Sequence, residues 1–135
     1  MAKNVSTMIV VDQDKILIQQ RSKTSPGSGF WNFPGGSVEE GESLEIAAIR
    51  ELKEEANLDV NEEDITYLGN YAGKYLTIHF FITREFVGKV KINQESDDYQ
   101  WISVEEFPKY QFVGGGKLHP KLLANIKSFM EGKLG

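Results

Sequence analysis

Three glutamates near the middle of the chain have the types and the spacing that could bind a hard metal ion. Glu51, Glu54 and Glu55 lie in the run RELKEE. If Ser43–Ala56 is a helix, these carboxylates fall within one arc roughly 100° wide. Such crowding costs roughly 0.2–0.5 kcal/mol per like-charged pair, and the C-terminal end of a helix also disfavours anions. Clustered carboxylates are the ligands that Mg²⁺ or Mn²⁺ prefers, so a metal site and an ordinary solvated acidic face are both open interpretations.

The predicted helix Ser43–Ala56 positions these carboxylates at the edge of the protein core. It has glutamates in its first turn and neither glycine nor proline inside. Its apolar residues form a second arc that adjoins the carboxylates: Leu44, Ala48, Ile49, Leu52 and Ala56. Asn57 follows the helix, and we expect it to take the left-handed conformation, which asparagine tolerates better than most residues.

Strands dominate the rest of the chain. Thr7–Val11 and Lys15–Gln20 flank a turn signal and predict a hairpin, and Ile65–Tyr71 and Leu76–Phe86 predict a second pair of strands. Further expected elements are a loop at Ser22–Gly29, a strand at Tyr99–Ile102, a capped helical turn in SVEEF that stops at Pro108, a loop at Tyr110–Lys117 and a helix at Pro120–Met130. This order predicts an α/β fold in which a mixed sheet packs between helices.

Composition narrows the function classes. The chain has 135 residues, of which 40% are hydrophobic, so we expect a single globular domain over residues 1–135. The net charge of −5 argues against broad binding of nucleic acid. No apolar run approaches the roughly 18 residues of a membrane span, and the first residues lack the core of a signal peptide. The absence of cysteine fits a cytoplasmic location.

The residues in front of the glutamates extend the pattern. After Gly36 come five residues, Glu42, seven residues, the run RELKEE, one residue, Asn57 and Leu58. This order resembles the Nudix box, the signature of the Nudix hydrolases, at six of its seven fixed residues and both aliphatic positions. Asn57 stands where the family usually has glycine. The preceding FPGG, the strand-rich second half and a tryptophan after an acidic segment extend the resemblance over most of the chain.

The resemblance implies a Nudix-type α/β/α sandwich with a mixed sheet, in which the box forms a loop-helix-loop. It also implies hydrolysis of a nucleoside diphosphate linked to another group, with Mg²⁺ or Mn²⁺ as cofactor. The metal ligands and catalytic residues that it implies are Glu51, Glu54, Glu55 and the carbonyl of Gly35, with Gly35 and Gly36 next to the substrate. Arg50 would pair with Glu42 and orient the carboxylates. An exposed ion pair worth under ~1 kcal/mol is the alternative interpretation of that pair.

Four positions outside the box are also carried over from members of the family, three of them from MutT-like members. Glu95 lies six residues before Trp101, where such members place a further metal-binding or basic glutamate; a solvated loop charge is the alternative. Arg21 and Phe33 align with positions that contact the nucleotide, although a strand-end surface charge and a core residue are the alternatives. Tyr75 stands near the tyrosine of diadenosine polyphosphate hydrolases of this family, and a strand tyrosine is common.

The resulting hypothesis is a MutT-like pyrophosphohydrolase. Its expected substrate is a (d)NTP, including an oxidised purine such as 8-oxo-dGTP, and its products are a nucleoside monophosphate and pyrophosphate. The alternatives are a dinucleoside polyphosphate, ADP-ribose or capped-RNA hydrolase and, in another class, a non-catalytic nucleotide-binding module. The expected partner is a small nucleotide, with no membrane and no nucleic acid, and both a monomer and a homodimer are open.

Overall fold

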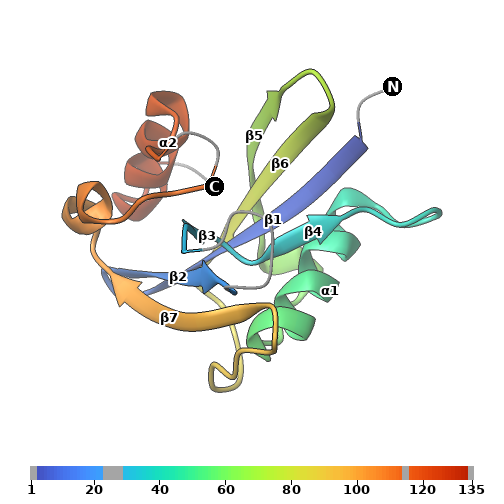
Figure 1. The fold of residues 1–135 in the computed structure, drawn as a ribbon, viewed down its shortest axis with the longest axis horizontal. Coiled ribbons are helices and arrows are strands. Elements are labelled where there is room, and N and C mark those ends of the chain that lie inside the picture. Colours follow the sequence, from blue (N-terminus) through green and yellow to red (C-terminus); the bar gives the residue numbers. More distant parts are fainter. Residues whose placement is uncertain (1–2, 23–28, 114–115, 134–135) are drawn as a thin grey trace.

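The computed structural model describes residues 3–22, 29–113 and 116–133. Its strands are β1 (Lys3–Asp12), β2 (Lys15–Arg21), β3 (Trp31–Asn32), β4 (Gly35–Ser37), β5 (Thr66–Ala72), β6 (Leu76–Thr83) and β7 (Ser96–Ile102). Its α-helices are α1 (Leu44–Ala56) and α2 (Pro120–Met130), and its short 3-10 helices are η1 (Glu62–Asp64) and η2 (Val104–Lys109). The strands form one sheet in the order β3-β2-β1-β6-β5, in which β4 also pairs with β1 and β7 with β2 (Figure 1).

Strand β1 is central because it pairs along both of its edges. On one edge it runs parallel to β6 from Lys3 to Val10. On the other edge it pairs antiparallel with β4 and then, at Val11 and Asp12, with β2. The sheet is therefore mixed, as predicted. Strands β2 and β4 share one edge of β1, so that one helix can reach both of them.

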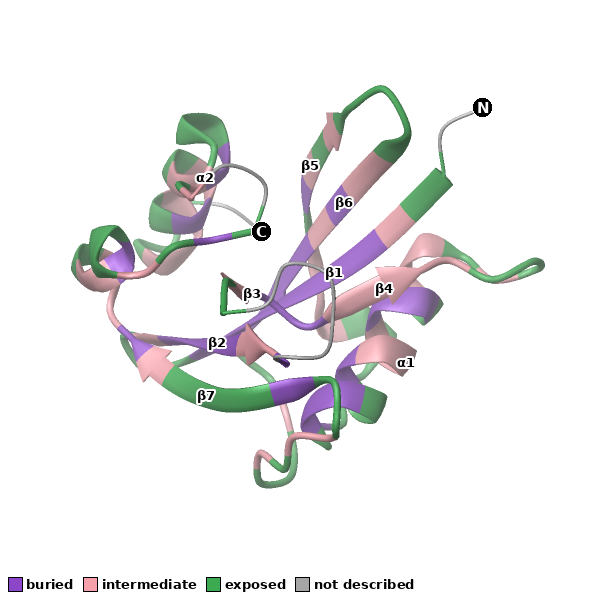
Figure 2. Cartoon of the chain, in the orientation of Figure 1, coloured by how far each residue is buried: buried purple, intermediate pink, exposed green. Residues whose placement is uncertain are grey.

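The two α-helices cover opposite faces of the sheet (Figure 1). Each strand can pack against both helices because its side chains point alternately to the two faces. The core beneath α2 contains Ile9, Val11, Ile16, Ile18, Phe33, Leu68, Ile82, Ile102, Phe107, Phe112, Leu122 and Ile126. The core beneath α1 contains Met8, Val10, Leu17, Ala48, Leu52, Ala56, Leu58, Val60 and Phe81. Figure 2 shows the buried residues running along β1 and β2 and along one side of α1. The predicted α/β/α sandwich is confirmed.

Several local predictions are confirmed. The hairpin of β1 and β2 turns where the sequence signal lies, and Gln13 takes a positive φ of 58° there. Helix α2 has the predicted bounds. The capping box that starts η2 is formed by Ser103 and Glu106, whose side chain accepts hydrogen bonds from the backbone N–H and the hydroxyl of Ser103, each at 3.0 Å. Trp101 packs against the core beneath α1, stacked on Phe86.

Several predicted boundaries are wrong. Strand β1 begins at Lys3 rather than Thr7, because it pairs with β6 from Lys3 onward. Strand β6 ends at Thr83 rather than Phe86, because the Thr83 hydroxyl accepts a hydrogen bond from the N–H of Glu85 and turns the chain. Strand β7 begins at Ser96 rather than Tyr99, because it pairs with β2 from Arg21 back to Ile16. Pro108 lies inside η2 and does not stop it, since so short a helix needs few backbone donors.

Two predicted loops lie partly outside the described residues. Only the ends of Ser22–Gly29 are described, and Tyr110–Lys117 is described without residues 114–115. No helix of the described chain combines the length and the apolar character that a bilayer crossing needs.

Candidate active site

Helix α1 presents its glutamates from a fixed position because both of its ends are capped. The Ser43 hydroxyl accepts a hydrogen bond from the N–H of Ile46 at 3.1 Å. Asn57 ends the helix in the left-handed conformation, with φ 64° and ψ 28°, and its N–H donates to the carbonyl of Lys53. The prediction for Asn57 is confirmed. The predicted apolar arc also packs on the core, with Ala48, Leu52 and Ala56 buried and Leu44 and Ile49 partly buried.

Glu55 points into the protein and has only 4% of its surface exposed. One carboxylate oxygen accepts a hydrogen bond from the N–H of Gly35 at 3.1 Å, and the other accepts one from the side-chain amide of Gln19 at 2.7 Å. The pKa of Glu55 is raised to about 9, first by burial and then by the carboxylates of Glu51 and Glu95, while the Gln19 hydrogen bond lowers it. Burial and the neighbouring carboxylates thus disfavour the ionised form of Glu55, and a bound cation would favour it.

Glu51 lies against β4 at a point where no side chain would fit. A Cβ on Gly36 would lie 2.5 Å from the Glu51 carboxylate carbon and 2.6 Å from each of its oxygens. A Cβ on Gly35 would lie 2.6 Å from the hydroxyl oxygen of Thr7. The two glycines are therefore needed because the glutamate and the neighbouring strand approach the backbone closely. They place the loop in front of α1 directly against the carboxylates.

Arg50 connects that loop to the helix. Its Nε and Nη2 donate to the two carboxylate oxygens of Glu42 at 2.7 and 2.9 Å, and Nη2 also donates to the carbonyl of Ser37 at 3.1 Å. The Arg50 hydrogen bonds are the main reason why the pKa of Glu42 is lowered to about 2. The same hydrogen bonds raise the pKa of Arg50. The side chains are 15% and 23% exposed, so this pair is largely shielded from solvent and joins the loop to α1.

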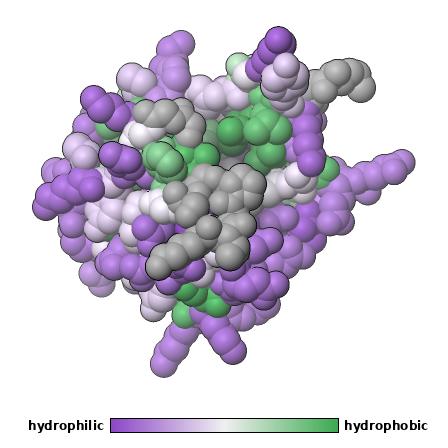
Figure 3. All heavy atoms as spheres, in the orientation of Figure 1, coloured by the Kyte–Doolittle hydropathy of each residue, from purple (hydrophilic) through white to green (hydrophobic). Residues whose placement is uncertain are grey.

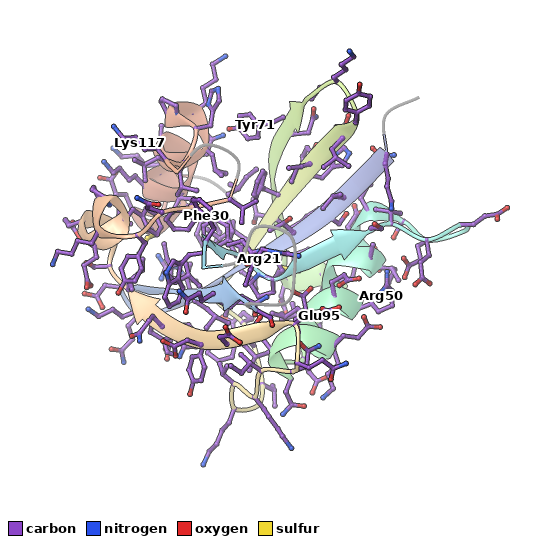
Figure 4. The ribbon with its side chains drawn as sticks, in the orientation of Figure 1. Arg21, Phe30, Arg50, Tyr71, Glu95 and Lys117 are labelled. Atoms are coloured by element: carbon purple, nitrogen blue, oxygen red, sulfur yellow. The ribbon has the colours of Figure 1, made fainter. Side chains whose placement is uncertain are left out.

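Glu54 and Glu95 are the exposed members of the predicted set. The Glu54 side chain is 55% exposed, and its carboxylate lies 3.3 Å from Nη1 of Arg50. Glu95 lies in the turn before β7, where its carbonyl accepts a hydrogen bond from Ser22 at 3.0 Å. The charge of Glu95 contributes to the raised pKa of Glu55. Figure 4 likewise shows Glu95 next to α1.

Within the described residues, no three acidic or histidine side chains already converge on one point as metal ligands. Arg50 explains this, because it draws Glu51 and Glu54 toward its guanidinium, with Glu51 at 2.9 Å. The donor set nevertheless fits a hard divalent ion, since it offers only oxygen atoms and surplus negative charge. A cation could compete with one guanidinium nitrogen for the exposed carboxylate of Glu54 and the largely buried carboxylate of Glu51.

Comparison with known proteins identifies the family. The NUDIX domain model matches residues 2–123. The chain belongs to the Nudix family. It is 33% identical over 86 residues to an 8-oxo-dGTP diphosphatase of Proteus vulgaris, covering 62% of this chain and 77% of that protein. It is 33% identical over 104 residues to a CTP pyrophosphohydrolase of Escherichia coli, covering 75% of this chain and 76% of that protein. The solution structure of the E. coli ORF135 protein superposes with a TM-score of 0.74 at 26% identity, covering 96% of this chain and 89% of that one.

These comparisons confirm three predictions made from the sequence: the Nudix family, its fold, and an enzyme of the Nudix pyrophosphohydrolase class. Nudix hydrolases generally use divalent metal ions. The roles of the individual site residues are not tested by the comparisons and stay predictions.

The Nudix residues predicted to touch the substrate lie in different places. Arg21 ends β2, and its backbone N–H donates to the carbonyl of Phe30 at 2.8 Å (Figure 4). Phe33 is only 4% exposed and packs in the core beneath α2, as its alternative interpretation states. Tyr75 is 71% exposed and lies in the turn between β5 and β6, beside Lys3 at the end of β1 farthest from β2. Arg21 thus lies on β2, the strand whose Gln19 contacts Glu55. Tyr75 lies at the other end of the sheet, away from the glutamates.

Sequence reasoning missed Gln19. The residue is 2% exposed and contacts Glu55, which is 36 positions away in the chain. The signal was its place two residues after Leu17 on β2, since side chains two apart share a face of a strand. A polar residue on the face that Leu17 buries needs a polar partner.

Proposed function

We propose that this protein hydrolyses a (d)NTP to a nucleoside monophosphate and pyrophosphate, using Mg²⁺ or Mn²⁺, and that oxidised purines such as 8-oxo-dGTP are among its substrates. The observation that carries the proposal is the placement of the three box glutamates. Glu55 is held inside between β2 and β4, Glu51 lies against β4, and Glu54 lies toward solvent. The relatives named for 8-oxo-dGTP and CTP hydrolysis support this choice of substrate class.

In this proposal, Glu51, Glu54, Glu55 and the carbonyl of Gly35 hold the divalent ion. When bound, such an ion neutralises phosphate charge, polarises phosphorus and lowers the pKa of water. The chain's own groups do the rest. The Arg50–Glu42 pair keeps the loop fixed against α1, so that the carboxylates do not have to be ordered during the reaction.

Water attacks an inner phosphorus in this mechanism, and the bond from that phosphorus to the bridging oxygen breaks. The bridging oxygen leaves with the outer two phosphates as pyrophosphate. A glutamate accepts the proton of the attacking water, and Glu95 is suited to this role because it is exposed and lies near Glu55. Glu54 is the second candidate for the base, since its carboxylate is also exposed.

The remainder of the substrate needs a second contact region. A cavity of about 760 Å³ is lined by Phe30, Tyr110 and Lys117, among others, a size suited to a small ligand. Backbone hydrogen bonds link its lining residue Phe30 to Arg21, and the next residue, Ser22, to Glu95. Figure 3 shows hydrophobic side chains near α2 and the β5–β6 hairpin on the same face, amid hydrophilic surroundings. We propose that this side of the molecule binds the nucleoside, and Arg21 the phosphates.

A substrate panel with identification of the products tests the proposal. We expect the highest kcat/KM for a (d)NTP, products of monophosphate and pyrophosphate, and no turnover in excess chelator. Glu54→Gln should lower the rate by ~10²-fold or more, as expected for a group that binds metal or takes a proton. Glu45→Gln, on the first turn of the same helix, is the matched control.

Other outcomes would change the proposal in defined ways. Single orthophosphate released from a triphosphate would contradict the reaction type. A kcat/KM at least tenfold higher for a dinucleoside polyphosphate, ADP-ribose or capped RNA would replace the substrate class and leave the metal chemistry in place. Binding of nucleotide without turnover would point to a non-catalytic module. We also propose a cytoplasmic location, which rests on the cysteine-free composition alone.

A further inference from the structure

Gln19 lies outside the Nudix box but contacts its most buried carboxylate. It comes from β2, and its side-chain amide donates to Oε1 of Glu55 at 2.7 Å. The N–H of Gly35, from β4, donates to Oε2 at 3.1 Å. One donor from each of the two strands thus fixes both oxygens of Glu55, and with them the plane of its carboxylate.

Both of these donors are neutral, and this distinguishes Glu55 from the other box glutamates. Arg50 forms ion pairs with Glu51 and Glu54, whereas Glu55 has no ion pair within the described residues. A guanidinium or ammonium group in place of Gln19 would orient Glu55 equally well, but it would also neutralise the carboxylate. An amide orients the group without forming an ion pair that an incoming cation would have to break.

The other end of Gln19 indicates that the residue is not there for stability alone. Its Oε1 is buried and has no hydrogen-bond partner in the described part of the chain. A buried acceptor without a partner is destabilising, and an apolar side chain of the same shape would avoid that cost. Leu17 occupies the same face of β2 in just this way. Gln19 thus leaves one buried acceptor unpaired and keeps one side-chain contact, the hydrogen bond to Glu55, as expected of a residue at a functional site.

We propose that Gln19 is a positioning residue that holds the Glu55 carboxyl group in the orientation that binds the divalent ion. The proposal rests on the metal-dependent function proposed above. Partners of metal ligands outside the ligand set typically contribute 10–100-fold to metal affinity or activity. We therefore expect removal of the Gln19 donor to weaken binding of the ion itself, before any substrate is present.

The test is a titration of the substrate-free protein with Mn²⁺, followed by electron paramagnetic resonance of the free ion. Gln19→Met removes the donor and keeps the length and volume of the side chain. Gln19→Asn keeps the amide but withdraws it by one methylene. Gln100→Met, on the exposed surface of β7, is the matched control. We expect both Gln19 variants to bind Mn²⁺ about tenfold more weakly or worse, and Gln100→Met to bind as the wild type does.

The outcomes separate this proposal from the proposed function. If the wild type binds Mn²⁺ and Gln19→Met binds it within twofold as well, the role of Gln19 is contradicted and the metal chemistry stands. If the wild type itself binds no Mn²⁺, both proposals fail. A fall in kcat with an unchanged melting temperature and an unchanged KM for substrate would support positioning, because a merely structural defect would lower the melting temperature. If Gln19→Met does not fold, Gln19→Asn carries the test.

Discussion

Gly36→Ala is expected to disable the enzyme without unfolding it. The new Cβ would lie 2.5 Å from the Glu51 carboxylate carbon and 2.6 Å from its oxygens, whereas ordinary contact begins at 3.4 Å. Glu51 must therefore move by roughly 1 Å, and a misplacement of about that size can cost ~10²-fold in rate. The fold should survive, because the atoms that must move form the end of a flexible side chain. We expect kcat to fall by ~10²-fold with little change in melting temperature.

Gly73→Ala is the control for this experiment, since a Cβ there would meet only the carbonyl of Leu76, at an ordinary 3.4 Å. The cause can be isolated with the double variant Gly36→Ala, Glu51→Asp, in which the shorter side chain makes room for the methyl group. Its loss should be smaller than the product of the two separate losses. Steady-state kinetics and thermal unfolding of the wild type, the two single variants, the double variant and Gly73→Ala decide the matter. Activity of Gly36→Ala within twofold of the wild type would refute the reasoning.

Three further predictions follow from the same geometry. Asn57→Gly should leave the free energy of unfolding nearly unchanged, while Asn57→Val should lower it by ~1 kcal/mol or more in urea titrations, because β-branched residues resist left-handed backbone. The pKa of Glu42 is lowered from 4.5 to about 2, so its contribution to stability is present above pH 4.5 and is lost as the pH falls toward 2. Unfolding from pH 6 to pH 2 should therefore depend less on pH in Glu42→Gln, and equal slopes would contradict the pairing with Arg50. Glu95→Gln should lower kcat more than it raises KM if it acts in the reacting complex, and unchanged kinetics would leave it a solvated charge.

Features set by neighbours in the chain could be predicted from the sequence. Helix α1 follows from its apolar period and its caps, and the left-handed Asn57 follows from its place after the last turn. Helix α2 begins at Pro120, where proline is tolerated, and it has the predicted bounds. The grouping of the three glutamates also needed only helical geometry, because all three belong to one element.

Features set by distant pairing could not be predicted in this way. The short strands β3 and β4 exist because β2 and β1 offer them hydrogen bonds, and their own residues carry no strand pattern. Strand β7 extends back to Ser96 for the same reason. The contact of Gln19 with Glu55 depends on how α1 packs against the sheet, and the contact of Glu51 with Gly36 depends on how β4 pairs with β1. No local periodicity contains that information.

The distances around Arg50 indicate how the site can remain folded without metal and still accept it. The contacts to Glu42 are 2.7 and 2.9 Å and use two nitrogens, whereas the contacts to Glu54 are 3.3 and 3.4 Å and share Nη1 with Glu51. Hydrogen bonds weaken as they lengthen, so Glu54 is held least firmly among the carboxylates hydrogen-bonded to Arg50, although the ion pair with Glu39 is longer still at 3.7 Å. A cation that takes Glu54 therefore breaks the weakest of these contacts, while the Glu42 pair continues to hold the loop against α1. In the absence of metal, the same guanidinium offsets the repulsion that three neighbouring glutamates would otherwise impose on the helix.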